Sequence, residues 1–202
     1  STLAATNNKT LFFPAGTFAI SGTLLLNRTL GVGVIGSGQA TRLLWIGGTA
    51  NGSRMLWSDG NTRFFIHGFV FDGAGACEVC APARTTGCEK RTNVAAPSDC
   101  DVPRPFAQVG LDHDSHTQFE SRFVHRDLAF LNFTVAGVRV GHNQYVPGGV
   151  ASAEMTFENC LWADCAAGVA LLAWNDYDNY FTRCRFVGNG YGIAASAGNV
   201  YV

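Results

Sequence analysis

The sequence is poor in charge, in long apolar runs and in helical patterns. Charged residues make up 14% of its 202 residues, and the net charge is −1, whereas an average globular protein is about 25% charged. Such a chain offers no basic surface for nucleic acid, so we expect no nucleic-acid partner. No apolar run approaches the ~20 residues that span a membrane. No stretch keeps a helical period beyond a turn or two, which argues against a helix-rich fold.

The sequence also lacks the common nucleotide-binding and hydrolase motifs. It contains no phosphate-binding loop and no nucleophile elbow. Residues 31–36, GVGVIG, match the spacing of a dinucleotide fingerprint, but the helical pattern that this motif requires does not follow them. Glycine is abundant: it accounts for 24 of the 202 residues, whereas the average protein contains about 7% glycine. We interpret the glycines of residues 31–36 as corners of a fold that has many turns.

What the chain has instead is a repeat. Residues 157–173 read FENCLWADCAAGVALLA, and residues 181–196 read FTRCRFVGNGYGIAAS. Both contain Phe, Cys, an aromatic residue, Gly and a branched aliphatic residue at the same relative positions. Earlier copies of the pattern begin at Phe18, Leu43, Phe69 and Leu128, at successive intervals of 25, 26 and 59 residues. A recurring period of 20–50 residues is typical of stacked solenoid folds.

The elements inside each copy are short strands. Runs at 17–20, 23–26, 64–66 and 137–140 consist mainly of apolar and β-branched residues, and Gly, Asn and Asp lie between them. A sandwich or jelly roll also has short strands, but neither requires one pattern to recur at a fixed interval. In a solenoid, equivalent side chains stack about 4.8 Å apart. We therefore expect Cys160 to lie on Cys184, close enough for a disulfide, although stacked free thiols in the core are the expected state.

Residues 10–24, TLFFPAGTFAISGTL, resemble the opening coil of the pectate-lyase-like right-handed parallel β-helix superfamily. The resemblance covers nearly the whole chain and implies an all-β, single-stranded right-handed parallel β-helix over residues 1–202, with coils of about 24–26 residues. The superfamily includes polysaccharide lyases, glycoside hydrolases, epimerases, phage tailspikes and non-catalytic surface proteins. The fold it implies therefore does not imply one activity.

The two ends depart from this family pattern. Related proteins usually carry a helix that caps the first coil, whereas only residues 1–9 precede it here, and residues 199–202 resemble the start of another coil. Uncapped coils expose unpaired strand edges. We therefore expect either a segment of a longer protein, or protein partners that associate with the ends or sides of the solenoid.

The repeat is interrupted at about residues 74–108 by a cysteine-rich insertion. It contains Cys77, Cys80, Cys88 and Cys100. Two disulfides would tie down this loop, in any of three pairings; zinc bound by the four thiolates is the alternative, but a second Cys-x-x-Cys is missing. Glycosylation sequons begin at Asn8, Asn27, Asn51 and Asn132. Together, the cysteines and sequons favour a secreted, extracellular glycoprotein.

Residues 110–116, GLDHDSH, are the first candidate for chemistry. On an extended strand, Asp112, Asp114 and His116 share one face. Paired carboxylates bind Ca²⁺ or act as an acid–base pair; a solvated polar turn is the alternative. Arg139 alternates with valines and should face outward, either as a catalytic group or as a plain surface charge. These four residues are the candidate catalytic residues.

A second candidate group could bind substrate. It consists of His142, Trp174, Asp176, Tyr177 and Asp178. The aromatic residues could stack on a sugar, while a turn that favours Asn and Asp is the simpler interpretation of residues 174–179.

The resemblance implies a carbohydrate-active protein. Lyases of the superfamily use Arg or Lys to take the proton beside a uronate carboxyl group, but Arg139 and His142 match no specific lyase motif. The Asn-Thr-Asp, Asp-Asp and Gly-His-Gly set of the polygalacturonases is absent. We therefore predict an extracellular lyase or hydrolase of an acidic polysaccharide, with a non-catalytic structural or adhesive β-helix as the alternative.

Overall fold

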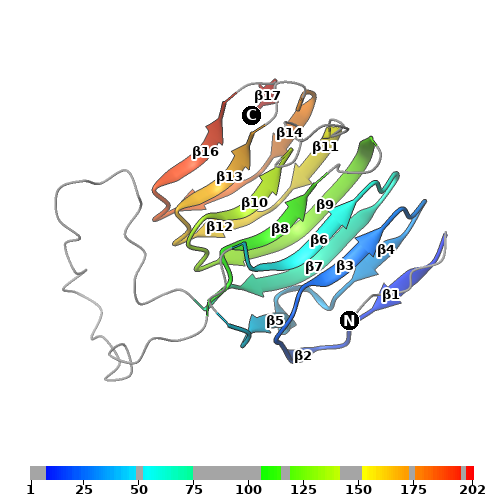
Figure 1. The fold of residues 1–202 in the computed structure, drawn as a ribbon, viewed down its shortest axis with the longest axis vertical. Helices are drawn as coiled ribbons and strands as arrows, with labels where there is room; N and C mark the ends of the chain where they lie inside the picture. The colour runs from blue at the N-terminus through cyan, green and yellow to red at the C-terminus, as the bar shows by residue number, and fades with distance from the viewer. Residues whose placement is uncertain are drawn as a thin grey trace.

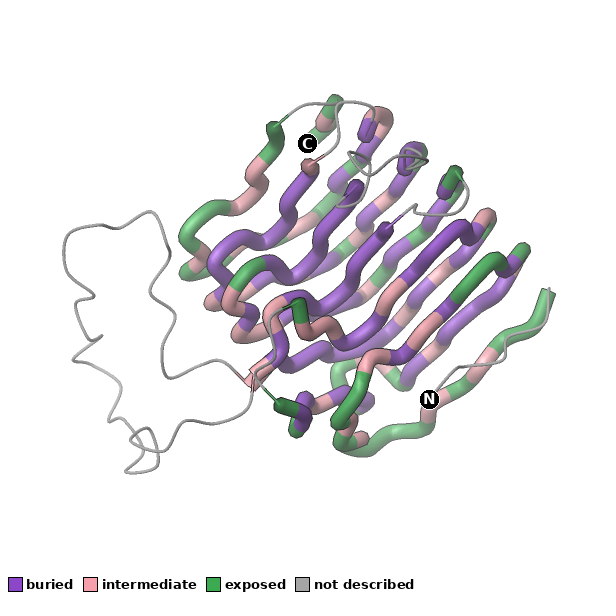
Figure 2. Tube along the Cα trace, in the orientation of Figure 1, coloured by how far each residue is buried: buried purple, intermediate pink, exposed green. Residues whose placement is uncertain are grey.

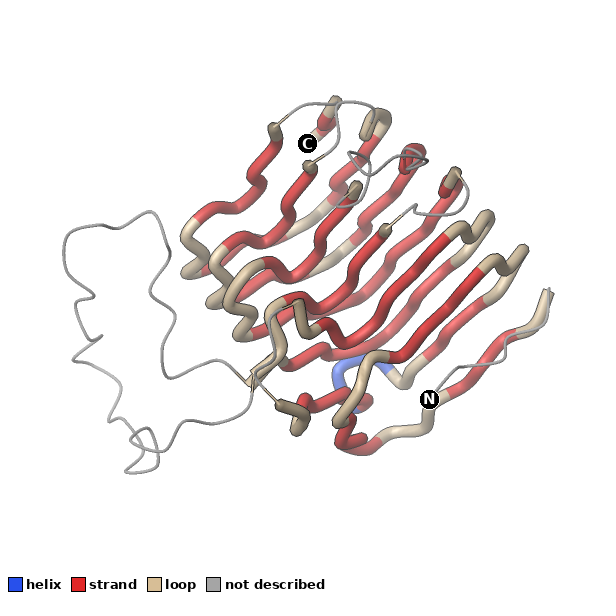
Figure 3. The backbone as a smooth tube through the Cα atoms, viewed as in Figure 1, coloured by secondary structure: helices blue, strands red, loops and turns tan. Residues whose placement is uncertain are grey.

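The computed structural model describes residues 8–48, 52–74, 106–114, 119–141, 152–172, 176–196 and 199–202. Over these ranges the protein is nearly all β, with two parallel sheets (Figure 1). One turn of 3₁₀ helix, η1 (Gly38–Ala40), lies between strands β4 (Gly33–Ile35) and β5 (Thr41–Trp45) (Figure 3). Within the described part of the chain, no helix is long and apolar enough to cross a membrane.

The strands divide between an eleven-stranded and a six-stranded sheet. The larger sheet contains β1 (Thr10–Phe12), β2 (Gly16–Ile20), β4 (Gly33–Ile35), β5 (Thr41–Trp45), β7 (Phe65–Asp72), β9 (Glu120–Leu131), β11 (Ser152–Glu158), β12 (Leu161–Ala163), β14 (Asn179–Thr182), β15 (Arg185–Val187) and β17 (Val200–Tyr201). The smaller sheet contains β3 (Leu24–Asn27), β6 (Arg54–Asp59), β8 (Val109–His113), β10 (Ala136–Val140), β13 (Ala167–Leu171) and β16 (Tyr191–Ala195). The chain alternates between the sheets, which run as two layers along the molecule (Figure 1).

The strand register confirms most of the predicted repeat. Phe157 pairs with Phe181, and their rings stack with centroids 5.0 Å apart. Phe69 pairs with Leu128, as predicted from the 59-residue interval that contains the insertion. One predicted rung is wrong, because Leu43 pairs with Phe71 instead of Phe69. The repeat is also less regular than predicted, because β9 and β11 pair at an offset of 32 residues.

The core lies between the two sheets and is built from stacked aromatic rings. Phe71, Phe130, Trp162 and Phe186 form one continuous column, with neighbouring centroids 5.1, 5.7 and 4.7 Å apart. Figure 2 shows the buried residues following one another along the strands of both layers. Each fully buried aromatic or branched side chain contributes roughly 1.5–3 kcal/mol to the free energy of unfolding.

The glycines of the repeat permit this ring column to lie close to the six-stranded sheet. A Cβ atom on Gly168 would lie 2.6 Å from the carbonyl oxygen of Gly192 and 2.8 Å from the ring of Phe186. A Cβ atom on Gly137 would lie 2.6 Å from the Trp162 ring. Glycine therefore recurs because a side chain at this position would collide with the next rung.

The three cysteines of the repeat, Cys160, Cys165 and Cys184, are free thiols, which confirms the expected state of the stacked pair. The thiols of Cys160 and Cys184 share a hydrogen bond, which raises the pKa of Cys160 and lowers that of Cys184 to about 7. Burial raises the pKa of Cys165 to about 12. The four cysteines of the insertion, Cys77, Cys80, Cys88 and Cys100, lie outside the described residues.

The sequons differ in their surroundings. Asn8 and Asn27 are exposed. Asn132 is only partly exposed, and it donates a hydrogen bond from Nδ2 to Oδ1 of Asp72 over 3.0 Å, so it is less accessible than Asn8 and Asn27. Asn51 lies outside the described residues. Glycosylation therefore stays a prediction that fits Asn8 and Asn27 better than Asn132.

Candidate functional site

Five residues of β6, the end of β8 and β10 form a group that we call the arginine–aspartate cluster: Arg54, Trp57, Asp112, Asp114 and Arg139. Trp57, Asp112 and Arg139 pair in register, so they form one row across the six-stranded sheet. Their strand neighbours, such as Leu111 and Val138, fill the core. Because side chains alternate along a strand, the row projects from the opposite, outer face of the sheet.

Asp112 is the centre of this cluster. Arg139 donates from Nε to its Oδ1 over 2.8 Å and from Nη2 to its Oδ2 over 2.7 Å. Arg54 donates from Nη1 to the same Oδ2, and the same nitrogen is 3.3 Å from Oδ2 of Asp114. The Arg54 guanidinium lies 4.1 Å above the centre of the Trp57 ring. Two guanidinium groups therefore balance two carboxylates at one place.

The environment keeps Asp112 ionised. Its side chain is fully buried, and burial raises its pKa, but hydrogen bonds and charge attraction from Arg139 and Arg54 outweigh this and lower the pKa below its usual value. Asp112 therefore holds no proton to donate near neutral pH. Ca²⁺ does not fit here, because guanidinium groups already occupy both oxygens of Asp112 and would repel the cation.

The structure corrects the simpler interpretation of Arg139 as a surface charge. Arg139 is only 8% exposed, and its guanidinium group forms an ion pair with Asp112. The predicted convergence of Asp112 and Asp114 with a basic residue does occur, and Arg54 supplies the shared contact. His116, the remaining member of the predicted catalytic group, lies outside the described residues.

The three predicted substrate-binding residues that the structure describes do not join this cluster. Asp176 is fully buried, and its carbonyl oxygen accepts a hydrogen bond from Asn179, so its burial disfavours the predicted contact with substrate. The carbonyl oxygen of Tyr177 accepts a hydrogen bond from the backbone of Glu154. Asp178 lines a hollow on the other sheet. His142 and Trp174 lie outside the described residues.

The sequence interpretation missed Arg54 and Trp57. Trp57 occupies the rung directly before Asp112, but the two are separated in sequence by the cysteine-rich insertion. The aromatic residue of β6 also faces outward, so it does not continue the Phe–Cys–aromatic pattern. The alignment of Trp57 with Asp112 on neighbouring strands could have identified this residue. That alignment becomes visible in the sequence only when the insertion is left out of the repeat.

A second polar group lies inside the core. His113 and His125 share a hydrogen bond between their Nε2 atoms, 2.9 Å apart, and Nδ1 of His113 is 3.5 Å from Oε2 of Glu120. Ser58 donates to Glu120 over 2.7 Å. All four side chains are fully buried. Burial raises the pKa of Glu120, and burial together with the charge on His113 lowers that of His125 well below its usual value. These groups are enclosed, so their role is structural.

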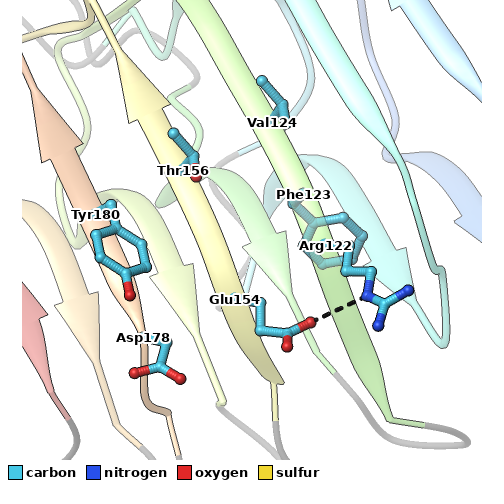
Figure 4. A pocket seen from close by; sticks show the side chains of 7 residues that line it. All are labelled: Arg122, Phe123, Val124, Glu154, Thr156, Asp178 and Tyr180. Atoms are coloured by element: carbon cyan, nitrogen blue, oxygen red, sulfur yellow. Dashed lines mark hydrogen bonds and ion pairs between the residues drawn. The ribbon is translucent and has the colours of Figure 1, made fainter.

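The outer face of the eleven-stranded sheet has an open hollow of about 410 Å³, which we call the tyrosine groove (Figure 4). Its lining comes from β9, β11 and the start of β14 and consists of Arg122, Phe123, Val124, Glu154, Thr156, Asp178 and Tyr180. Arg122 donates from Nε to Oε2 of Glu154 over 3.4 Å. The groove and the arginine–aspartate cluster therefore lie on different sheets.

Comparison with known proteins adds little to this geometry. No family model matches the chain, and no curated protein matches it. One similar solved structure is described as a "putative glycosyl hydrolase" from Parabacteroides merdae, with a TM-score of 0.40 and 13% identity over 94% of this chain and 84% of that one. The described residues thus define an all-β protein of parallel sheets, and no family or activity follows from the comparison.

Proposed function

We propose that the chain is a right-handed parallel β-helix, and that it binds an acidic polysaccharide at the arginine–aspartate cluster. Parallel pairing throughout both sheets and the stacked repeat support the fold, as does the resemblance of residues 10–24 to the opening coil of pectate-lyase-like proteins. The extracellular location that we predict from cysteines and sequons agrees with a polysaccharide ligand.

The observation that carries this proposal is the state of Arg54. Its side chain is 21% exposed, whereas those of Asp112 and Asp114 are fully buried. Within the described ranges, only Nη1 of its guanidinium donates to a protein acceptor. The remaining N–H groups form a planar edge that suits a carboxylate, such as that of a uronate residue. The two aspartates and Trp57 already hold this group, so little side-chain freedom would be lost on binding.

The same geometry favours binding over cleavage. General acid–base catalysis needs a group that exchanges a proton with the substrate. Asp112 is ionised and accepts hydrogen bonds on both oxygens, and Arg139 is engaged by Asp112 through two nitrogens. Neither is available as the proton acceptor of a lyase. Lyase or hydrolase activity therefore stays a prediction from the sequence, and our proposal is limited to binding.

Affinity electrophoresis in gels that contain polygalacturonate, alginate or neutral dextran tests the proposal. We expect the acidic polymers alone to retard the protein, and Arg54→Ala to weaken binding by about tenfold or more, as expected for a hydrogen-bonded charge pair. Arg185→Ala is the matched control, because it removes the same charge from an exposed position on β15.

Two results would contradict the proposal. One is migration that no acidic polymer changes, which would leave the structural or adhesive alternative. The other is equal retardation of the wild type and Arg54→Ala. Absorbance from new unsaturated ends in the same polygalacturonate solutions would show elimination and would overturn the limitation to binding.

A further inference from the structure

A row of outward-facing residues crosses the eleven-stranded sheet at the tyrosine groove. Val124, Thr156, Tyr180 and Tyr201 pair in register on β9, β11, β14 and β17. The rings of Tyr180 and Tyr201 are stacked, with centroids 4.8 Å apart and planes inclined by 13°. Both are exposed, at 44% and 46%. The stack ends at Thr156, whose small side chain supplies no ring.

This end of the stack opens into the groove. One face of Tyr180 contacts Tyr201, and the other is directed toward the Thr156 rung, where the hollow of about 410 Å³ begins (Figure 4). Val124 is two rungs from Tyr180, or about 9.6 Å at the usual strand spacing. A six-membered ring placed above Thr156 would continue the stack at the same interval. The volume falls in the range of small-molecule sites, roughly 300–1,000 Å³.

Polar side chains surround this position. Arg122, Glu154 and Asp178 all have left-handed backbone, with φ of 61°, 56° and 58°, and they occupy equivalent positions on β9, on β11 and directly before β14. Figure 4 shows Glu154 between the other two, bonded to Arg122. The rim therefore offers both hydrogen-bond donors and acceptors beside an aromatic face.

We propose that the tyrosine groove is a second saccharide site, which binds a neutral pyranose residue at the Thr156 rung. The pyranose ring packs on the free face of Tyr180, and its hydroxyl groups bond to Glu154, Asp178 and Arg122. This site is independent of the arginine–aspartate cluster and of the acidic ligand proposed there.

The charges of the groove select this class of ligand. Arg122 offsets Glu154, and Asp178 leaves the rim with a net charge of −1. An acidic sugar would be repelled by this balance. A small cation would use the acceptors only, and Arg122 would repel it. Sugar hydroxyls both donate and accept, so a neutral sugar uses every polar group of the rim.

Saturation-transfer NMR tests the site with four probes: the methyl glycosides of glucose, mannose, galactose and xylose. We irradiate aromatic protons of the protein and expect transfer to the ring protons of at least one glycoside. Thr156→Phe should abolish the transfer, because a phenyl ring would then occupy the position of the sugar. Thr182→Phe is the matched control, since it adds the same ring at an exposed position of β14 outside the groove.

A second variant keeps the test decisive if Thr156→Phe is misfolded. Tyr180→Ala removes the platform at an exposed position and should also abolish the transfer. Absence of transfer to all four glycosides in the wild type overturns the proposal, as does transfer that persists in Thr156→Phe or Tyr180→Ala. Arg54→Ala should retain the full signal, so failure of the acidic-polysaccharide proposal and failure of this one are distinguishable.

Discussion

Arg139 and Asp112 form a bidentate ion pair between the neighbouring strands β10 and β8, with nitrogen–oxygen distances of 2.8 and 2.7 Å. The pair faces away from the apolar core, yet Asp112 is fully buried and Arg139 nearly so. A buried ion pair adds little to the free energy of unfolding compared with apolar packing. Loss of one partner, however, leaves the other charge buried and uncompensated. The pair therefore fixes the position of Arg54 more than it adds to stability.

We predict that Asp112→Ala lowers the free energy of unfolding by about 3 kcal/mol, because two guanidinium groups lose their shared partner. Urea unfolding followed by circular dichroism measures this loss. The double variant Asp112→Ala/Arg139→Met should recover part of it, since one unpaired charge is removed as well. If the double variant is as unstable as the sum of both single variants, the pair is not coupled as described.

We predict that Gly168→Ala lowers the free energy of unfolding by about 2 kcal/mol through overpacking. The added methyl group would lie 2.6 Å from a backbone oxygen of the next strand. Gly22→Ala is the control, because a Cβ atom there meets no other heavy atom within 4 Å. Thermal unfolding of the two variants compares them directly, and equal melting temperatures would contradict the close approach at Gly168.

The stacked core was predictable because a constant offset aligns equivalent side chains. The match between Phe157 and Phe181 follows from the sequence alone, since 24 residues separate each pair of equivalent positions there. The partnership of Arg54 with Asp112 was not predictable, because the inserted segment hides the register. Likewise, Asp176 and Asp178 look alike in sequence, but the turn directs only one into the interior. Local sequence does not determine that direction.

The buried histidine pair predicts a pH dependence of stability. The pKa of His125 is well below its ordinary value of 6.5 in the folded protein, so the unfolded chain binds a proton that the folded chain resists. His125 therefore contributes full stability above pH 6.5, and that contribution falls as the pH decreases toward the folded pKa. Glu120, whose pKa is raised, acts in the opposite direction: its contribution is present below its unfolded pKa and is lost as the pH rises.

Comparison with His125→Phe isolates the histidine contribution. The aromatic neighbours of His125 accommodate a phenyl ring, but the variant loses the bond to His113 and should be less stable by about 1–3 kcal/mol at pH 7.5. We expect this difference to shrink as the pH falls from 7.5 to 5.5, because only the wild type has the histidine at this position. Urea unfolding at both pH values measures the difference; a constant value would contradict the prediction.

The stacked thiols predict selective reactivity at Cys184. With a pKa of about 7, roughly three quarters of Cys184 is thiolate at pH 7.5, whereas the raised pKa values of Cys160 and Cys165 keep both protonated. Iodoacetamide should therefore modify Cys184 at least tenfold faster than either, as peptide mass spectrometry would show. Because the hydrogen bond from Cys160 stabilises the thiolate, Cys160→Ala should slow the modification of Cys184, whereas Cys165→Ala should not. Equal slowing by both variants would show that general loosening of the core, and not the shared hydrogen bond, controls the reaction.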